Sequence, residues 1–454
     1  MLHDGKSQCK SLFSNLWTRI CHPGGFARNF SIYLTATLLN QSLPFLLIPI
    51  LTRHLSPEQY GTLALFNIVF VLSKALVGGA MVNAVSREFF RLDQQQMAAV
   101  FPNLLGLLAA NTLVVVALAA AASGHLAEWL QIPAFWLIVT PLAGGFGVIH
   151  LLNCTLLRNL KQPLQFGVFQ IAQTALDLSL SLVLVVAFAW GWEGRATGMT
   201  VACVVAALLA VGNMIRRGYW RPELDWAVWR RAALVTLPLI PNSVFVIVMM
   251  HSGKVFLNAG FDRAEVGLYA VGQQVAMIVH FLGQAFLLGW GPFAFEILAR
   301  QEENAVRCIL RSTVAFSVGI LIVAFAVFLG AGLVLYLMTT PEYYGAQSFV
   351  GWMAAGYAFC SVYHLFTPML VHRDQQHHIA VISGLGAGVN ILLNVLLIRE
   401  IGPTGAAVAF LATYVFMCAL MIAYVQKIFQ PPWREVFRLR DWVVSPESNK
   451  VADS

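Results

Sequence analysis

Residues 55–64 read Leu55-Ser-Pro-Glu-Gln-Tyr-Gly61-Thr-Leu-Ala64, and residues 261–270 read Phe261-Asp-Arg-Ala-Glu-Val-Gly267-Leu-Tyr-Ala270. Aligning the two stretches matches Gly61 with Gly267 and Ala64 with Ala270 at an offset of 206 positions. A second pair, residues 191–196 and 402–407, aligns at the similar offset of 211 positions. Self-similarity at a nearly constant offset predicts a chain built from two related halves.

Long apolar stretches surround these repeats. A membrane core of about 30 Å needs roughly 20 apolar residues per helix, and the chain combines a mean hydropathy of +0.73 with only 11% charged residues. We therefore predict an all-α polytopic membrane protein with twelve transmembrane helices and short loops. The expected spans are residues 30–51, 61–82, 98–121, 134–156, 165–188, 197–215, 233–257, 267–290, 310–335, 347–370, 378–398 and 404–426.

Positive charge alternates from loop to loop. Most of the 28 Lys and Arg residues fall on the side of the N-terminus. The exceptions are Arg53, Arg195, Arg263 and Arg399 in the opposite loops, and Lys74 and Lys254 inside spans. Because positively charged loops remain cytoplasmic, we expect both termini to be cytoplasmic.

Six spans separate the repeated segments, so both halves have the same orientation. This predicts two six-helix lobes related by a parallel pseudo-two-fold repeat, and transporters built in this way bind substrate at the membrane midplane between the halves. The expected parts are an interfacial segment at 1–28, an N-lobe at 29–215, a basic cytoplasmic linker at 216–231, a C-lobe at 232–427 and a cytoplasmic tail at 428–454.

Polar side chains lie at helical spacing within the predicted spans. An ionisable residue at membrane depth costs on the order of 2.5–3.5 kcal/mol on insertion scales, so it normally faces the protein interior or a hydrated cavity. Lys74 and Lys254 are internal cations, one from each half, and Asp177 is the only acid clearly inside a span. The cavity is therefore expected to be neutral to positive and suited to phosphate and hydroxyl groups. The candidate substrate-binding residues are Lys74, Lys254, Asp177, Asn67, Gln173, Asn40, Gln41, Gln273, His280 and Arg53.

Each candidate also has a structural interpretation. Buried amides often hold membrane helices together, and Lys254 is close enough to the periplasmic end to extend toward the interface. Asp177 is expected either to neutralise one of the two lysines or to couple transport to protons. His280 is either a packed, hydrogen-bonded side chain or a proton relay.

Other functional classes lack their motifs. The sequence contains no G-x-x-x-x-G-K-[ST] phosphate loop, so we expect no direct use of ATP. The net charge of +7 comes from basic loops on the predicted cytoplasmic side. These loops would face anionic lipid, so we expect no nucleic-acid partner. The cysteines and histidines lack metal-ligand spacing, so we expect no metal and no cofactor. The longest non-membrane stretches, about thirty residues each, are too short to hold an active site, so we do not expect an enzyme.

Three segments carry a resemblance to a known family. Residues 44–61, from Pro44 through Leu-Thr-Arg53 to Tyr-Gly61, resemble the first-span exit of polysaccharide-biosynthesis flippases, which reads roughly P-x-L-T-R-x-L-x-x-x-x-Y/F-G. Val266-Gly-Leu-Tyr-Ala-Val271 resembles their entry to the eighth span, and residues 390–409 resemble their last hairpin. These flippases form part of the multidrug/oligosaccharidyl-lipid/polysaccharide (MOP) exporter superfamily.

The resemblance implies alternating access and transfer of a polyprenyl-pyrophosphate-linked oligosaccharide repeat unit from the cytoplasmic to the periplasmic leaflet of the bacterial inner membrane. The headgroup would cross in the cavity while the polyprenyl tail stays in lipid, supplying O-antigen, lipopolysaccharide or another exopolysaccharide. The expected partners are membrane lipid and the lipid-linked oligosaccharide, with H⁺ or Na⁺ as candidate coupling ion and a polysaccharide polymerase as candidate protein partner.

The chain departs from the family pattern in its seventh span. Residues Ser252-Gly253-Lys254-Val255 stand where the family often has Asp-Arg, so a cation is kept and the acid is lost. No Arg is expected deep in any span, which disfavours the peptidoglycan-precursor branch of the superfamily. A cation-coupled multidrug antiporter of the same fold is the alternative function, although it would need more acids. A membrane-embedded polymerase or ligase is a third, although it would need a large extracytoplasmic loop.

Overall fold

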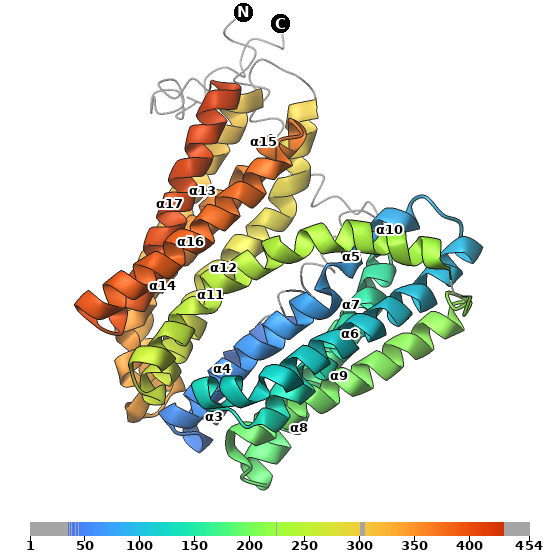
Figure 1. Ribbon diagram of the computed structural model, residues 1–454. Coiled ribbons are helices and arrows are strands. Elements are labelled where there is room, and N and C mark those ends of the chain that lie inside the picture. The colour runs from blue at the N-terminus through green and yellow to red at the C-terminus, as the bar shows by residue number, and fades with distance from the viewer. Residues whose placement is uncertain are drawn as a thin grey trace, which may run out of the picture.

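The computed structural model describes residues 45–430 apart from Leu224 and residues 300–304, together with residues 35, 37, 39, 40, 42 and 43. Its regular elements are all helical, with no strand among the described residues (Figure 1). The expected interfacial segment and most of the C-terminal tail lie outside the described residues, as does much of the first predicted span. The end of that span is seen as α3 (Ile48–His54).

The N-terminal half contains helices whose ends follow from local sequence. Ser56 accepts a hydrogen bond from the Gln59 amide and Pro57 opens α4, while Asp93 and Gln96 form a capping box at α6. The elements are α4 (Pro57–Lys74), the π-helical turn η1 (Ala75–Gly79), α5 (Met81–Phe89), α6 (Gln94–Leu130), α7 (Ala134–Asn159), α8 (Pro163–Leu182), η2 (Val183–Ala187) and α9 (Gly191–Arg216).

The C-terminal half begins within the predicted linker. Its first helix packs against α5 and α6, and Asn103 of α6 accepts hydrogen bonds from the Asp225 amide and the Trp229 indole. The elements are α10 (Trp226–Thr236), η3 (Leu237–Leu239), α11 (Ile240–Gly260), α12 (Arg263–Ala299), α13 (Ala305–Met338), η4 (Pro341–Ala346), α14 (Gln347–Leu365), α15 (Thr367–His372), α16 (Gln376–Ile401) and α17 (Thr404–Phe429).

Within the described residues, 11 helices or runs of consecutive helices are long and apolar enough to cross a membrane. Each of them contains or overlaps one of the predicted spans from the second to the twelfth, and most extend a few residues beyond it. The prediction of a multi-pass all-helical membrane protein is therefore confirmed. The domain boundaries at 28/29, 215/216, 231/232 and 427/428 stay predictions.

The helices form two bundles that meet along α4 and α12 (Figure 1). A Cβ added to Gly61 would lie 2.1 Å from the carbonyl oxygen of Arg263, and one added to Gly267 would lie 2.1 Å from that of Pro57. The two glycines matched by the sequence repeat thus pack against each other, as expected when a pseudo-two-fold axis passes between equivalent helices. Only glycine permits this approach.

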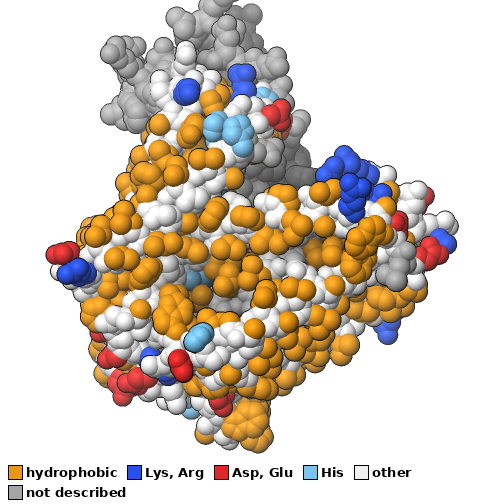
Figure 2. Space-filling model, viewed as in Figure 1, with side chains coloured by type: hydrophobic (Ala, Val, Ile, Leu, Met, Phe, Trp, Pro, Cys, Tyr) orange, Lys and Arg blue, Asp and Glu red, His pale blue; other side chains and the backbone are white. Residues whose placement is uncertain are grey.

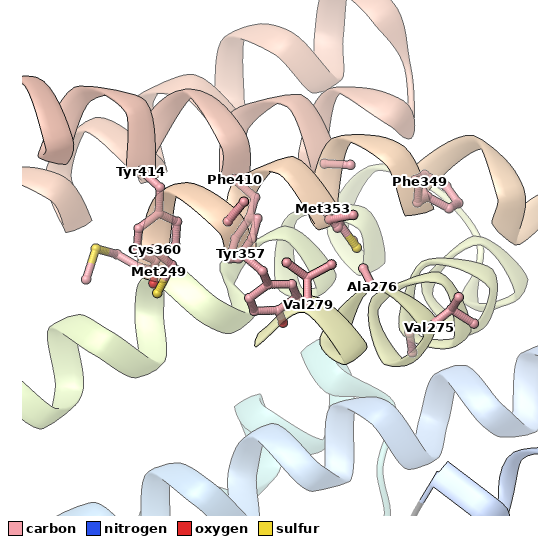
Figure 3. Packing of buried hydrophobic residues seen from close by; sticks show 14 of the residues in the cluster. Met249, Val275, Ala276, Val279, Phe349, Met353, Tyr357, Cys360, Phe410 and Tyr414 are labelled. Atoms are coloured by element: carbon pink, nitrogen blue, oxygen red, sulfur yellow. The ribbon is translucent and has the colours of Figure 1, made fainter. Parts of the chain in front are cut away.

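The C-terminal bundle has a core of aromatic and small aliphatic side chains. Tyr357 of α14, Phe410 of α17 and Val279 of α12 lie close together in this core (Figure 3). The rings of Tyr357 and Phe410 meet edge to face with centroids 4.9 Å apart. This packing holds α12 and α14 in fixed positions, and both helices contribute residues to the site described below.

Candidate functional site

A polar cavity of about 230 Å³ lies between the two bundles. It is walled by α3, α4 and α9 on one side and by α11, α12 and α14 on the other. Its polar lining residues are Tyr60, Asn67, Arg195, His251, Lys254, Gln273, Gln274, His280 and Tyr357. Four residues predicted from sequence, Asn67, Lys254, Gln273 and His280, are therefore brought together in what we call the polar cavity.

Helical periodicity explains how α11 and α12 line this cavity. His251 and Lys254 are three residues apart on α11, and Gln273, Met277 and His280 follow at intervals of four and three on α12. Such intervals place side chains on one face of a helix. The stripes recognised in the sequence thus face the space between the bundles.

Lys254 is buried, with 7% of its surface exposed. Its ammonium has no hydrogen bond or ion pair with any described residue. A buried cation without a partner is costly, because it has lost water and gained no compensating charge. An anion entering the cavity would relieve that cost.

Arg195 is the second cation of the cavity, and it has a partner. Its guanidinium donates to both carboxylate oxygens of Asp177, with 3.1 Å between Nη2 and Oδ2, and to Ser181 Oγ at 2.7 Å. The pair is largely buried, with side-chain exposures of 10% and 18%. Asp177 therefore neutralises Arg195 rather than one of the lysines.

The position of Arg195 corrects one expectation. Its assignment to a loop is wrong, because α9 begins at Gly191 and Arg195 is a buried residue of that helix. The expectation that no arginine lies deep in a span stays a prediction, because Arg195 lies near the start of α9. The small neighbours Gly194 and Gly198 were the missed signal, since a Cβ on Gly198 would lie 2.5 Å from Ser181 Oγ. Such residues indicate close helix packing rather than a loop.

Polar groups from both bundles complete the cavity. Gln273 Nε2 donates to the Met250 carbonyl and to the Tyr357 hydroxyl, each at 3.0 Å. Tyr60 of α4, which sequence reasoning missed, donates to Gln274 Oε1 across the two bundles at 2.7 Å. The Nδ1 atoms of His251 and His280 are buried without a hydrogen-bond partner among the described residues. These two histidines retain hydrogen-bonding capacity for a ligand.

Lys74 lies outside the polar cavity. It is half-buried within the N-terminal bundle, where a Cβ on Gly147 would be 3.8 Å from both Lys74 Nζ and Cys203 Sγ. The glycines of α7 leave room for the lysine stem between α7 and α9. The structure therefore does not bring Lys74 and Lys254 into one cavity.

The other predicted residues also lie elsewhere. Asn40 accepts a hydrogen bond from Thr174 of α8, and Gln173 is half-buried on the same helix. Arg53 is exposed at the end of α3, and Gln41 is outside the described residues. Substrate contact by any of the ten candidates stays a prediction.

Several hydrogen bonds between the bundles cluster at one end. Tyr343 donates to the Leu55 carbonyl at 2.8 Å, and Asn258 Nδ2 donates to the Trp129 carbonyl at 3.0 Å. Arg263 Nη1 donates to Thr62 Oγ1 at 3.1 Å. These residues adjoin the loops predicted to be periplasmic. The bundles are thus joined at that end and diverge toward the other (Figure 1).

The fold matches solved structures of transporters. An inward-facing multidrug resistance MATE family transporter of the MOP superfamily aligns with a TM-score of 0.70 and 14% identity, covering 86% of this chain and 96% of that one. Lipid II flippase MurJ in an inward closed conformation aligns with a TM-score of 0.68 and 12% identity, covering 87% of each chain. An outward-facing MATE transporter gives 0.58 at 13% identity, covering 91% of this chain and 97% of that one. The protein is a multi-pass membrane protein with the MOP-superfamily transporter fold.

Sequence comparison identifies the family within this class. Residues 26–287 match the family described as polysaccharide biosynthesis protein, and the chain belongs to that family. An uncharacterized membrane protein of Haemophilus influenzae is 23% identical over 278 residues, 60% of this chain and 65% of the relative. Lsg locus putative protein 1 of the same organism is 21% identical over 282 residues, 60% of this chain and 66% of the relative. The chain spans just under two thirds of the length of these relatives.

Proposed function

We propose that the protein moves a polyprenyl-pyrophosphate-linked oligosaccharide from the cytoplasmic to the periplasmic leaflet of the bacterial inner membrane, for assembly of a surface polysaccharide. The family and the fold support a transporter of the flippase class. The single observation that supports this substrate class is the unpaired, buried Lys254 in a polar cavity between two bundles.

The charge of the cavity favours a phosphorylated headgroup. Arg195 is neutralised by Asp177, so Lys254 supplies a surplus positive charge. Two opposite unit charges 4 Å apart attract by about 4 kcal/mol at an effective dielectric constant of 20. The amides and hydroxyls of Asn67, Gln273 and Tyr60 add hydrogen-bonding groups of the kind that sugars require.

The way the bundles meet supports transport by alternating access. In this conformation they are joined at the end predicted to be periplasmic, so a headgroup would enter from the end predicted to be cytoplasmic. Separation of α4 and α12 at the glycine crossing, where Gly61 packs against Gly267, would then release the headgroup to the periplasmic side. Each step needs the bundles to tilt about the polar cavity, which remains between them.

The antiporter alternative fits the cavity less well. A carrier for organic cations needs carboxylates to attract its substrate and exchange it against an ion. Among the described lining residues none is an Asp or Glu, and Asp177 is already paired with Arg195. This distribution of charge favours an anionic substrate.

A direct test replaces Lys254 and measures transport. Lys254→Met should lower movement of a labelled lipid-linked oligosaccharide in proteoliposomes by roughly tenfold, equal to about 1.4 kcal/mol, because the anion loses its cationic partner. Lys254→Arg should keep most of the transport. Folding should not suffer in Lys254→Met, since replacing a buried charge with an apolar group of similar size is often neutral or stabilising.

Arg399→Met is the matched control, because it removes an exposed cation outside the cavity. Its transport should equal that of the wild type. Normal transport by Lys254→Met at wild-type protein levels would remove the cationic-cavity argument.

A further inference from the structure

A large apolar hollow lies beside the polar cavity. Its volume is about 730 Å³, and its walls come from α4, α6 and α7 of one bundle and α11 of the other. Representative lining residues are Leu72, Val115, Leu118, Ala119, Val244 and Val248. Figure 2, which views the molecule from the side of α6 and α11, shows a hollow between these helices bordered by hydrophobic side chains. We call it the apolar groove.

The apolar groove faces the membrane. On α6, Val114, Leu118 and Trp129 line it while being 56%, 65% and 50% exposed. In a membrane-spanning helix such exposed apolar side chains contact lipid chains. An apolar hollow of this size does not favour water, so a hydrocarbon chain is the occupant that its surroundings supply.

The groove and the polar cavity share a border. On α11, His251 lines both, while Ser252 faces the groove and Lys254 faces the cavity. On α4, Leu65 faces the groove and Ala64 the cavity. One molecule with a polar head and an apolar chain would therefore fit both hollows, with its junction beside α4 and α11.

Polar chemistry at the border suits a phosphate. His251 Nδ1 is buried without a partner among the described residues, and Lys254 lies one helical turn away without an ion pair. Imidazole and ammonium groups both donate hydrogen bonds to phosphate oxygens. The side chains of His251 and Lys254 thus lie without partners in the described part of the chain, at the point where the head and chain of such a molecule would join.

The length of the groove distinguishes between kinds of chain. Its wall on α6 runs from Asn111 to Leu130, about 29 Å at 1.5 Å per residue. The whole hydrocarbon core is about 30 Å thick, so the groove extends through more than one leaflet. A phospholipid acyl chain fills a single leaflet, whereas a long polyisoprenoid chain reaches further.

We propose that the polyisoprenoid chain of the substrate lies in the apolar groove, with its pyrophosphate beside His251 and Lys254 and its sugars in the polar cavity. This inference rests on the proposed function. It replaces the expectation that the chain stays in bulk lipid during transport. The groove then carries part of the binding free energy and aligns the headgroup with the cavity.

The test uses the full-length protein in nanodiscs and undecaprenyl pyrophosphate carrying a photoreactive diazirine in its chain. Irradiation followed by peptide mass spectrometry should give saturable labelling of α6 between residues 111 and 130 and of α11 between residues 244 and 256. An excess of unlabelled lipid-linked oligosaccharide should compete with the probe. The same excess of phosphatidylglycerol should not.

Adjacent alanines on α6 provide matched variants. Ala119 lines the groove, whereas Ala120 is exposed and outside its lining. Ala119→Trp should fill the groove and lower labelling roughly tenfold, equal to about 1.4 kcal/mol. Ala120→Trp should label as the wild type does. Val244→Trp and Val246→Trp repeat this comparison on α11, so the test does not depend on the folding of one variant.

Three results would overturn the groove assignment. They are equal labelling in the groove-filling variants and the wild type, label spread evenly over lipid-facing helices, and competition by phosphatidylglycerol equal to that by the lipid-linked oligosaccharide. Transport of the oligosaccharide by wild-type proteoliposomes is measured in parallel. If transport occurs but the groove results are negative, this inference alone fails. If neither transport nor saturable labelling occurs, the proposed function fails with it.

Discussion

Arg195 and Lys254 reach the same cavity from opposite bundles, but only one of these cations has a partner. Arg195 of α9 is held by Asp177 and Ser181, whereas Lys254 of α11 is buried without an ion pair among the described residues. The number of basic residues near a cavity therefore does not set its charge. One cation is part of the scaffold, and the other is available to a ligand.

The largest expected effect comes from removing the partner of Arg195. Asp177→Ala leaves a buried guanidinium uncompensated, and breaking a buried pair typically costs about 3–5 kcal/mol. We expect about 3 kcal/mol, because the two side chains keep 10% and 18% exposure. Thermal unfolding in detergent, followed by tryptophan fluorescence, should show a lower Tm for this variant.

The double variant Asp177→Ala with Arg195→Met serves as the control for this prediction. It should recover part of the lost stability, because the uncompensated charge is gone. If Asp177→Ala were as stable as the wild type, Arg195 would not depend on its ion pair, and the contrast between a paired Arg195 and an unpaired Lys254 would fail.

The second prediction concerns the side of the membrane from which solvent reaches Arg195 and Lys254 in the polar cavity. Gly61→Ala would place a Cβ 2.1 Å from the Arg263 backbone oxygen, and overpacking of this kind costs about 1–3 kcal/mol. The bundles should separate at the end where they are now joined. Ala64→Cys, which lines the polar cavity, should then react several-fold faster with an impermeant maleimide added from outside.

Gly260→Ala is the matched control, since an added Cβ there meets nothing within 4 Å. It should leave the labelling rate unchanged. Equal labelling in the Gly61 and Gly260 variants would argue against the glycine crossing as the closure of the cavity.

The smallest effect on transport is expected from replacing Lys74, the other lysine predicted to lie inside a span. Lys74 lies within the N-terminal bundle rather than in the cavity, so Lys74→Met should change transport by about twofold or less, against the roughly tenfold loss expected for Lys254→Met. The same proteoliposome measurement checks both variants. A loss at Lys74 as large as that at Lys254 would show that substrate contacts both lysines during the transport cycle.

The sequence predicted most of the helices correctly but only part of the site. The apolar lengths predicted the spans from the second to the twelfth, and the repeat predicted that Gly61 and Gly267 are equivalent. The stripe on α12 was also recognised. Arg195 was missed because it lies near a helix start, where hydropathy does not separate a buried residue from a loop residue. Lys74 was placed with Lys254 because both are internal cations.

Apolar length and loop charge are properties of short segments, so the amino-acid sequence was enough to predict a chain that crosses the membrane many times, in two similar halves. Which polar groups meet depends on how the helices pack in three dimensions. Helix rotation and tilt set the direction of each side chain, and these depend on packing between distant segments, such as the approach of α4 to α12. For that reason Asp177 meets Arg195, Lys254 stays unpaired, and an apolar groove lies beside it.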